Sequence, residues 1–483
     1  MFLHPNPHYL IMSQIHFLSR VGRVRMCLLT VSLSLIFSLA CPAATYHVST
    51  SGSDVHPGTE TQPFLTVQKG IDVAQAGDVV LIAPGWYDEV VATKRSGTPD
   101  APIVLRGASG SDVMAFTVAH SRLTFEHLSI RGRINFSLTS GYCIVQDCIF
   151  NPESTTYPNN IAMAAGGLAD KGVRPVGHII RRNKFLNAKG KGVGVSITGK
   201  NHLIENNYYS SQNGADANWI FANDSIIRGN TFQNWSNPGI AALHTDLFQS
   251  WGNNGDVAVG NIIEGNFAVD CSGTQLGNID NVGDPARIKD WTWRNNIWIR
   301  VSGPLNLYSS GHSFYNNTWV QGPSTHSAAV LVRTASKGSA NGTKFFNNIF
   351  YICGVNPSNP GHGFYAWIES EGYPLTGLEA DYNLVIGKGE GTVKSSSWTA
   401  FGSNSNGLNG VDPLLVESSN PTTEAHVRLR KGSRAIGAGK DLSEFFSTDF
   451  SGRQRLNRWD IGAHQSGGAL SAPTGYREPV DGK

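Results

Sequence analysis

The chain has 483 residues, of which 40% are hydrophobic and only 15% charged, and 47 are aromatic. This composition excludes a disordered polyelectrolyte, a collagen and a coiled coil, because each of these needs a far more biased composition. Glycine contributes 54 residues, above its usual share of about 7%, which indicates many turns and strands and few helices.

Residues 1–44 have the features of a signal peptide. Arg20, Arg23 and Arg25 precede an apolar run of 14 residues from Cys27 to Ala40, and small residues follow it. The run is shorter than the roughly 20 residues that span a bilayer. We therefore predict a protein that is secreted, periplasmic or on the cell surface, with no membrane span.

The charge balance argues against a nucleic acid partner. The leader holds three of the 38 basic side chains and no acidic one, which leaves 35 basic against 36 acidic side chains. A nearly neutral chain has no electrostatic reason to bind nucleic acid or an anionic membrane. We expect neither partner, and we expect a monomer.

Four cysteines follow the leader: Cys143, Cys148, Cys271 and Cys353. They show no paired CxxC motifs of the metal-binding kind. We expect buried free thiols, with one bridge between Cys143 and Cys148 as the alternative.

The segment TYHVSTSGSDVHPGTETQPFLTVQKGIDVAQAGDVVLIAPGWY, residues 45–87, predicts a strand, a loop, a short amphipathic helix and a second strand. Thr66 is the expected N-cap of the helix, Val67 and Ile71 form its apolar face, and Gly77 ends it. We interpret residues 45–105 as an N-terminal cap.

A short phrase then recurs along the chain: apolar or β-branched residues, one or two polar residues, an asparagine, and an aromatic or apolar pair. The asparagines of the successive copies are Asn183, Asn207, Asn230, Asn266, Asn296, Asn317, Asn348 and Asn383. Two earlier copies carry His127 and Asp147 in the asparagine position.

The base unit of 20 to 24 residues fits one turn of a solenoid built from short strands and tight bends. Turns stacked at about 4.8 Å pair each strand with its equivalent in the next turn. Asparagine suits the bend because it tolerates the left-handed backbone region and its amide can bond to a stacked neighbour. We predict an asparagine ladder, with stacked aromatics beside it.

These phrases, the segment at 45–87 and the segment STDFSGRQRLNRWDIGAHQ at 447–465 resemble the right-handed parallel β-helix proteins of the pectin-lyase-like group. The resemblance implies an all-β, single-stranded right-handed parallel β-helix with a short N-terminal capping helix. Turns would occupy residues 106–386, and 387–483 would hold the final turns and a closing segment.

The long insertion between Asn230 and Asn266 is the main candidate for function, because insertions add groups without breaking the stacking. Strand alternation predicts that His244, Asp246 and Phe248 share the outer face, opposite Leu243, Thr245 and Leu247. Gln249 would face inward unless a bulge turns it outward.

Polar and aromatic groups are expected beside His244 and Asp246 on neighbouring turns, as a carbohydrate chain requires. The residues of this stripe are Asp216, Asn218, Trp219, Trp251, Gln275, Asn278, Asp280, Arg287, Lys289, Asn306, Tyr308, Arg333, Trp367 and Glu369.

Three functions remain open, of which a polysaccharide lyase acting on a uronic-acid polymer by β-elimination comes first. His244, Lys289 or Arg287 could be the base, with Asp246 as its partner. By analogy with β-helix pectate lyases, Asp216, Asp246 and Asp280 could hold Ca²⁺ through oxygen ligands.

The second function is a glycoside hydrolase, in which Asp246 would act with Asp216 or Asp280 across the scissile bond. The third is a non-catalytic carbohydrate-binding or surface protein that uses the same groove. In the first two cases the partner is a polysaccharide substrate, with the binding residues Asn218, Trp219, Gln249, Trp251, Asn306, Tyr308, Arg333 and Trp367.

Overall fold

The computed structural model describes residues 43–152, 159–163, 175–188, 192–239, 244–252, 257–280, 287–321, 329–335, 338–351, 366–370, 375–386 and 404–467. Residues 43–483 form one compact unit. Apart from its last two residues, the predicted signal peptide lies outside the described residues, as does Cys353. Within the described part of the chain, no helix has the length and apolarity that crossing a membrane requires.

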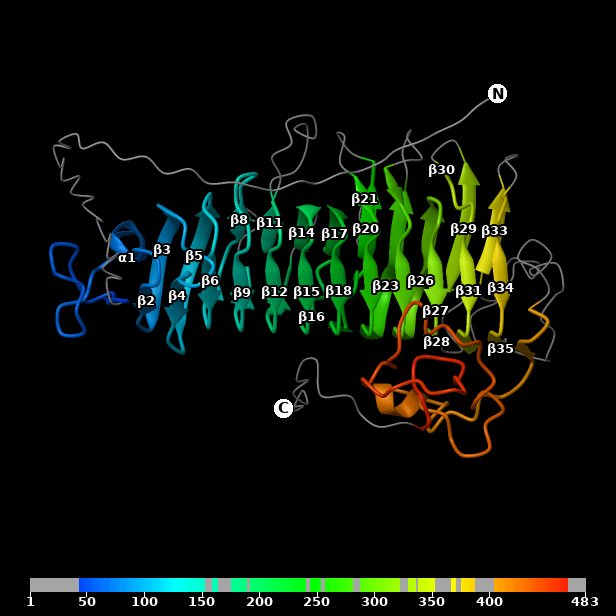
Figure 1. The fold of residues 1–483 in the computed structure, drawn as a ribbon. Coiled ribbons are helices and arrows are strands. Elements are labelled where there is room, and N and C mark those ends of the chain that lie inside the picture. The colour runs from blue at the N-terminus through cyan, green and yellow to red at the C-terminus, as the bar shows by residue number, and fades with distance from the viewer. Residues whose placement is uncertain are drawn as a thin grey trace, which may run out of the picture. The chain divides into compact units, whose positions relative to one another are not determined.

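The chain is a right-handed parallel β-helix in which each turn supplies up to three short strands (Figure 1). The first series of strands forms a 13-stranded parallel sheet in chain order. Its strands are β1 (Thr45–Val48), β2 (Val79–Ile82), β4 (Ile103–Gly107), β6 (Leu123–Glu126), β9 (Ile144–Gln146), β12 (Ile179–Arg181), β15 (Leu203–Glu205), β18 (Ile226–Arg228), β22 (Ile262–Glu264), β25 (Thr292–Arg294), β27 (Ser313–Tyr315), β31 (Lys344–Phe346) and β34 (Glu379–Asp381).

The second series also pairs in parallel from turn to turn. It comprises β7 (Ser129–Ile130), β10 (Ile149–Phe150), β13 (Lys184–Leu186), β16 (Tyr208–Ser210), β19 (Thr231–Gln233), β23 (Phe267–Asp280), β26 (Ile297–Tyr308), β28 (Thr318–Val320), β32 (Ile349–Tyr351), β35 (Leu384–Ile386) and β36 (Leu408–Asn409).

The third series carries the candidate site, and the long strands β23 and β26 belong to it as well. Its other strands are β3 (Gly85–Ala92), β5 (Ser111–Val118), β8 (Ile134–Phe136), β11 (Ile161–Met163), β14 (Val193–Lys200), β17 (Asp216–Asn223), β20 (Thr245–Trp251), β29 (Val330–Ala335) and β33 (Ala366–Ser370). A small parallel pair, β21 (Ala258–Val259) and β24 (Ile288–Lys289), lies outside these series, and β30 (Gly338–Ser339) pairs antiparallel with β29.

The predicted asparagine ladder is present at the corner between the first and second series. In each step the side-chain Nδ2 of one asparagine donates to Oδ1 of the asparagine in the next turn, at 2.9–3.4 Å. All eight predicted asparagines take part and are buried, and Asn404 adds a further step. The same Oδ1 atoms also accept backbone N–H groups, as in Asn183 N to Asn207 Oδ1 at 2.9 Å.

The two earliest repeat copies are one residue out of place in the sequence prediction. Cys148, not Asp147, occupies the ladder position, since its backbone N–H donates to Asn183 Oδ1 at 3.0 Å. Asp147 has φ 56° and His127 also has φ 56°, so both adopt the left-handed conformation. The eight predicted ladder asparagines do not adopt it; the residue before each of them does, as Arg182 at φ 54° illustrates. The bend and the ladder are therefore two adjacent positions.

The predicted helix is α1 (Val67–Val73), which packs on the first turn. The side chain of Thr66 accepts a hydrogen bond from the backbone N–H of Lys69, which confirms it as the N-cap. Val67 and Ile71 are buried, as expected. The helix ends at Val73, earlier than predicted, and Gly77 lies in the following turn with φ 93°.

The interior of the β-helix is one continuous hydrophobic cluster from Val48 to Val385. Aromatic rings stack from turn to turn beside the ladder, as predicted: Phe185 lies 4.7 Å from Tyr209, and Tyr209 lies 4.7 Å from Phe232, between ring centroids. Cys143, Cys148 and Cys271 are buried free thiols.

The closing segment packs against the outer side of the last turns. Its docking uses asparagines that precede the ladder residues: Asn316 Nδ2 donates to Asp460 O at 2.9 Å, and Asn347 Nδ2 to Lys440 O at 2.8 Å. The buried Arg455 donates to Asn295 Oδ1 at 2.8 Å. A 3₁₀ helix, Glu424–Val427, also belongs to this segment.

The ladder predicts a large, local effect on stability. Asn230 donates to Ile204 O and Asn266 Oδ1, and its own Oδ1 accepts two hydrogen bonds from Asn207. In the variant Asn230→Ala these buried partners lose their bonds, so we expect a loss of about 3 kcal/mol or more in the free energy of unfolding. Chemical denaturation measures this loss. The matched control is Asn234→Gly at an exposed left-handed position, φ 54°, which should change stability by less than about 0.5 kcal/mol. Equal effects of the two variants would contradict the ladder's role.

Candidate functional site

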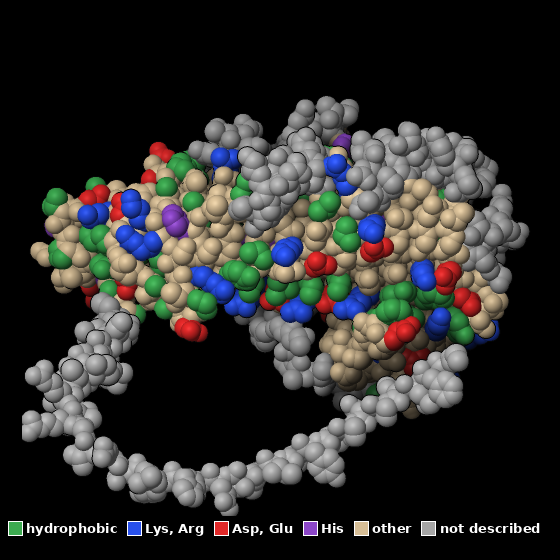
Figure 2. All heavy atoms as spheres, turned by 45° about the horizontal axis from the view of Figure 1, so that its top comes forward, with side chains coloured by type: hydrophobic (Ala, Val, Ile, Leu, Met, Phe, Trp, Pro, Cys, Tyr) green, Lys and Arg blue, Asp and Glu red, His purple; other side chains and the backbone are tan. Residues whose placement is uncertain are grey.

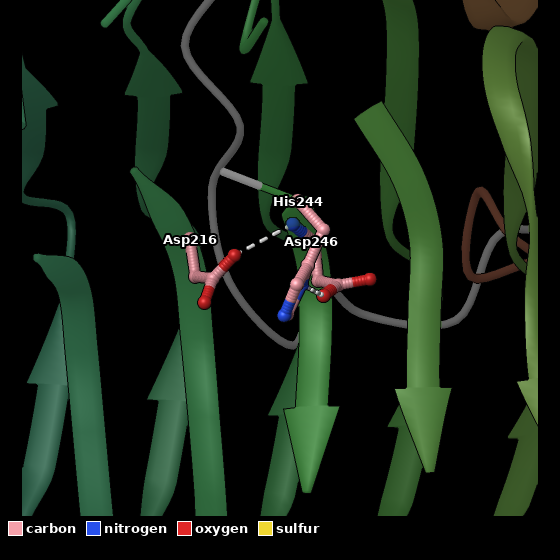
Figure 3. A group of neighbouring side chains, drawn as sticks. All are labelled: Asp216, His244 and Asp246. Carbon is pink, nitrogen blue, oxygen red and sulfur yellow. Dashed lines mark hydrogen bonds and ion pairs between the residues drawn. The ribbon is translucent and has the colours of Figure 1, made fainter. Parts of the chain in front are cut away.

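Two acidic residues that lie 30 positions apart in the sequence meet on neighbouring turns. Asn218 pairs with Phe248 between β17 and β20, and this register places Asp216 opposite Asp246. Asp216 Oδ1 accepts a hydrogen bond from the backbone N–H of Asp246 at 2.7 Å. His244, just before β20, bonds through Nδ1 to Asp246 Oδ2 at 2.8 Å (Figure 3).

The three side chains differ sharply in exposure. The His244 side chain is 61% exposed, whereas that of Asp246 is fully buried, and Asp216 is 7% exposed. Because Nδ1 of His244 is engaged by Asp246, Nε2 is the nitrogen available to a ligand. The site therefore offers an imidazole to solvent and holds two carboxyl groups behind it.

Asp216 also reaches an aromatic side chain on its own strand. Its Oδ2 accepts a hydrogen bond from the indole Nε1 of Trp219 at 2.7 Å. The Trp219 ring meets the Trp251 ring of the next turn edge to face, with 5.4 Å between centroids. The carboxyl group thus connects the ionisable cluster to a pair of half-buried tryptophans.

Burial and proximity shift the protonation of all three groups. Burial, and then the nearby charge of Asp246, raises the pKa of Asp216 to about 7. Burial also raises the pKa of Asp246. The hydrogen bond to Asp246 raises the pKa of His244, because it stabilises the imidazolium form. These upward shifts make both carboxyl groups weaker acids than exposed aspartates.

The alternation predicted for this strand is wrong at Phe248, and the solvent exposure expected of Asp246 is wrong as well. Asp246 lies on the same side of the strand as His244, to which it is hydrogen-bonded, but its side chain is fully buried. Phe248 lies in the core against Trp293 and Trp298. Leu247 and Phe248 are both buried, so two successive side chains point inward and Gln249 returns to the outward row.

On neighbouring turns, too, two successive residues point inward. The residues that follow these pairs therefore form a row of outward-facing side chains across the third series. Trp219, Gln249, Asn278 and Asn306 face one another in register. A second row, two residues further along each strand, runs through Phe221, Trp251, Asp280, Tyr308 and Arg333. Arg333 Nη1 donates to the Tyr308 hydroxyl at 2.8 Å.

Asn218 does not belong to the outward surface where we expected it. It is 2% exposed. Its Oδ1 accepts from the Tyr209 hydroxyl, and its Nδ2 donates to Leu247 O. Both ends of the amide are therefore bonded within the protein, and Asn218 is not available for a substrate contact.

Arg287, Lys289 and Asp280 lie away from the cluster. Asp280 pairs with Trp251, five residues and roughly 16 Å of extended strand beyond Asp246. Arg287 and Lys289 come further still, around β24, where Lys289 Nζ lies 3.6 Å from Asp290. Neither basic residue can share a reacting atom with His244, and Asp280 cannot share a metal ion with Asp216 and Asp246.

The cluster is also a poor match for Ca²⁺. One ligand atom from each of Asp216, His244 and Asp246 lies within 4.8 Å of the others. However, both oxygens of Asp216 accept N–H groups and Asp246 Oδ2 faces His244. Only Asp246 Oδ1 has no hydrogen-bond partner, and in Figure 3 it points away from the other two residues. Ca²⁺ takes about six to eight oxygen ligands, so we assign no calcium-dependent step to this cluster.

Two further candidates are placed only by their backbones. Trp367 and Glu369 on β33 pair with Leu331 and Arg333, so they continue the two rows in register. Their side chains lie outside the described residues. On the face drawn in Figure 2, acidic and basic side chains are interspersed and form no large patch of one sign.

Sequence reasoning missed Phe221, whose ring lies 4.6 Å from that of Trp251 and perpendicular to it. Its spacing of two from Trp219 on one strand was the available signal. It also missed the two hydrogen bonds of Asp216, which depend on the doubled inward residues and have no signature in a single strand.

The cluster predicts a distinct titration of His244. Its pKa should lie above 6.5 in the native protein and fall in Asp246→Asn, because the carboxylate that stabilises the imidazolium is lost. Buried His202 and His312, with pKa values lowered by burial to about 4 and about 3, should stay neutral at pH 6 and serve as internal controls. NMR titration of the imidazole resonances measures all three. An unchanged His244 pKa in Asp246→Asn would contradict the pairing.

Comparisons with known proteins agree with this architecture. Residues 50–95 match the family described as "Protein of unknown function (DUF1565)". The uncharacterized protein YwoF of Bacillus subtilis is 30% identical over 110 residues, 23% of this chain and 24% of that protein. Pectate lyase PEL9 of Emericella nidulans is 36% identical over 74 residues, 15% of this chain and 18% of that protein. The chain thus matches about a quarter or less of either relative's length.

Among solved structures, XylC in complex with xylose superimposes with a TM-score of 0.51 at 12% identity, covering 87% of this chain and 98% of XylC. At this identity the likeness concerns the fold alone. The chain is a right-handed parallel β-helix protein, as its resemblance to the pectin-lyase-like group predicts.

Proposed function

We propose that this protein is an exported polysaccharide lyase that cleaves a uronic-acid-containing polymer by β-elimination. The observation that carries the proposal is the exposed imidazole of His244, held at Nδ1 by the buried carboxyl group of Asp246. A neutral imidazole oriented in this way can act as a general base, and the hydrogen bond to Asp246 raises its pKa above the ordinary value.

In the proposed reaction, Nε2 of His244 removes the proton at C5 of a uronate, the carbon next to the carboxylate. The electron pair of that C–H bond forms the C4=C5 double bond, and the bond between C4 and the glycosidic oxygen breaks. The departing oxygen takes a proton from water. Asp246 orients the imidazole and stabilises its protonated form after the transfer.

The raised pKa values of the buried carboxyl pair limit its repulsion of an anionic substrate. Two ionised carboxylates beside a uronate would oppose its binding. Because burial and the charge of Asp246 raise the pKa of Asp216 to about 7, Asp216 is only partly ionised near neutral pH. This leaves less negative charge behind His244 than two free aspartates would carry.

The outward rows supply the expected contacts to a sugar chain. Trp219 and Trp251 offer aromatic surface, while Gln249, Asn278 and Asn306 place amide groups on successive turns. Pyranose rings stack on aromatic faces, and their hydroxyl groups need hydrogen-bond partners. The similarity to a protein named pectate lyase supports the same substrate class, and the signal peptide predicted at residues 1–44 supports export.

Hydrolysis is less well supported, because a glycosidase needs two carboxyl groups that face the bond from opposite sides. Here Asp246 is buried, both oxygens of Asp216 accept N–H groups, and Asp280 lies at the other end of its strand. The accessible ionisable group of the cluster is the imidazole.

The direct test is turnover of a panel of uronic-acid and neutral polysaccharides. We expect ultraviolet absorbance from the new double bond conjugated with the carboxylate, and a loss of about 10² to 10⁴ in kcat for His244→Ala. The control is His127→Asn, which replaces an exposed histidine on another corner with a residue that tolerates its left-handed backbone. New reducing ends without that absorbance would identify a hydrolase, and binding without turnover would identify a carbohydrate-binding protein; either result would refute the lyase.

The pH dependence follows from the role of His244 as a base. The reactive imidazole is neutral, so kcat/KM should rise as the pH increases through an apparent pKa above 6.5, shared by the three coupled groups. In Asp246→Asn the midpoint of the pH profile should move to lower pH, because the carboxylate that stabilises the protonated imidazole is lost. The maximal rate should also fall. A rate that declines with increasing pH across this range would mean that the group acts as an acid.

A further inference from the structure

We propose that Asp216 is a positioning residue that fixes the Trp219 indole and the backbone of Asp246 in one arrangement, so that sugar binding and proton abstraction are held in register. This inference deepens the proposed function and rests on it for its kinetic consequences. Its structural part stands on hydrogen bonds alone.

The evidence is the complete use of the Asp216 carboxyl group by two N–H donors. Oδ1 accepts from the Asp246 backbone and Oδ2 from the Trp219 indole, both at 2.7 Å. These short distances are typical of hydrogen bonds to a charged acceptor. Each oxygen is bonded to a protein donor and Asp216 is buried, so Asp216 acts through its partners and not by contact.

The backbone explains why an aspartate can reach both donors. Ala217 and Asn218 are buried one after the other, which returns Trp219 to the same outward side as Asp216. The carboxyl group then lies between its own strand and the start of β20. It links a residue three positions ahead in sequence with a residue 30 positions ahead.

The identity of the side chain matters because both partners are donors. A carboxylate accepts at both oxygens, whereas an asparagine would present its own N–H₂ group to one of the two donors. Asp216→Asn therefore preserves the shape and breaks at least one link. The edge-to-face contact with Trp251 restrains Trp219 on its other side. Without the carboxylate only this contact remains, and the indole can change its side-chain orientation.

The experiment combines Asp216→Asn, Trp219→Phe and the double variant. Trp219→Phe keeps an aromatic face, although a smaller one, and removes the indole donor. In indole ¹⁵N–¹H spectra without substrate, the resonance that disappears in Trp219→Phe should move upfield in Asp216→Asn. With an oligouronate that the native protein cleaves as substrate, each single variant should raise KM by about tenfold. The double variant should raise KM no further. Asp216→Asn should also lower kcat, since Asp246 loses its anchor, while Trp219→Phe should leave kcat nearly unchanged.

The matched control is Asp280→Asn, a buried aspartate on the outward row of the next turn, opposite Trp251. It should leave the Trp219 resonance in place, and its effect on KM should multiply with that of Trp219→Phe. An unmoved Trp219 resonance in Asp216→Asn, or multiplicative KM effects for Asp216 and Trp219, would overturn the inference. Because the spectra need no substrate, this failure is distinct from failure of the proposed lyase activity.

Discussion

The fixed register between successive turns is the constraint on which the site depends. The asparagine ladder holds that register, since each buried amide bonds both to the backbone of one neighbouring turn and to the amide of the next. Parallel strands of only two or three residues would otherwise slip easily, and a slip of one residue would reverse the facing of every side chain. With the register fixed, residues that are remote in sequence become neighbours, and Asp216 meets Asp246 through a single insertion.

The candidate site combines an exposed imidazole with two buried carboxyl groups. Placing two carboxyl groups together out of water raises their pKa values and would destabilise the fold if both ionised. Backbone N–H, indole and imidazole donors offset that cost, and each donor belongs to an element with a part in the proposed chemistry. The same hydrogen bonds therefore stabilise the carboxyl groups and orient the groups that donate to them.

The fold could be predicted from the sequence because it repeats. The period, the eight ladder asparagines and the N-cap at Thr66 each follow from local patterns, and the structure agrees with them. The predictions fail where the stacking of the turns decides which residue occupies a position and the local sequence pattern does not. The left-handed residue and the ladder residue are adjacent, so His127 and Asp147 matched the phrase at the wrong position. In the candidate site, the sequence predicted that His244 and Asp246 share one side of the strand, and their hydrogen bond agrees with this; Leu247 and Phe248, however, both point inward and break strict alternation. The distance of Lys289 and Asp280 from the cluster depends on how long each strand is and on how the strands of successive turns are paired. The sequence of the insertion alone does not give either.

The most direct test of the whole account is a crystal structure of the His244→Ala variant with a bound oligouronate. The account predicts a chain lying across the third series of strands, with a sugar ring against Trp219 and the C5 hydrogen of one uronate facing the space left by the imidazole. An oligosaccharide bound on another face, or one whose C5 atoms all lie beyond reach of position 244, would contradict it.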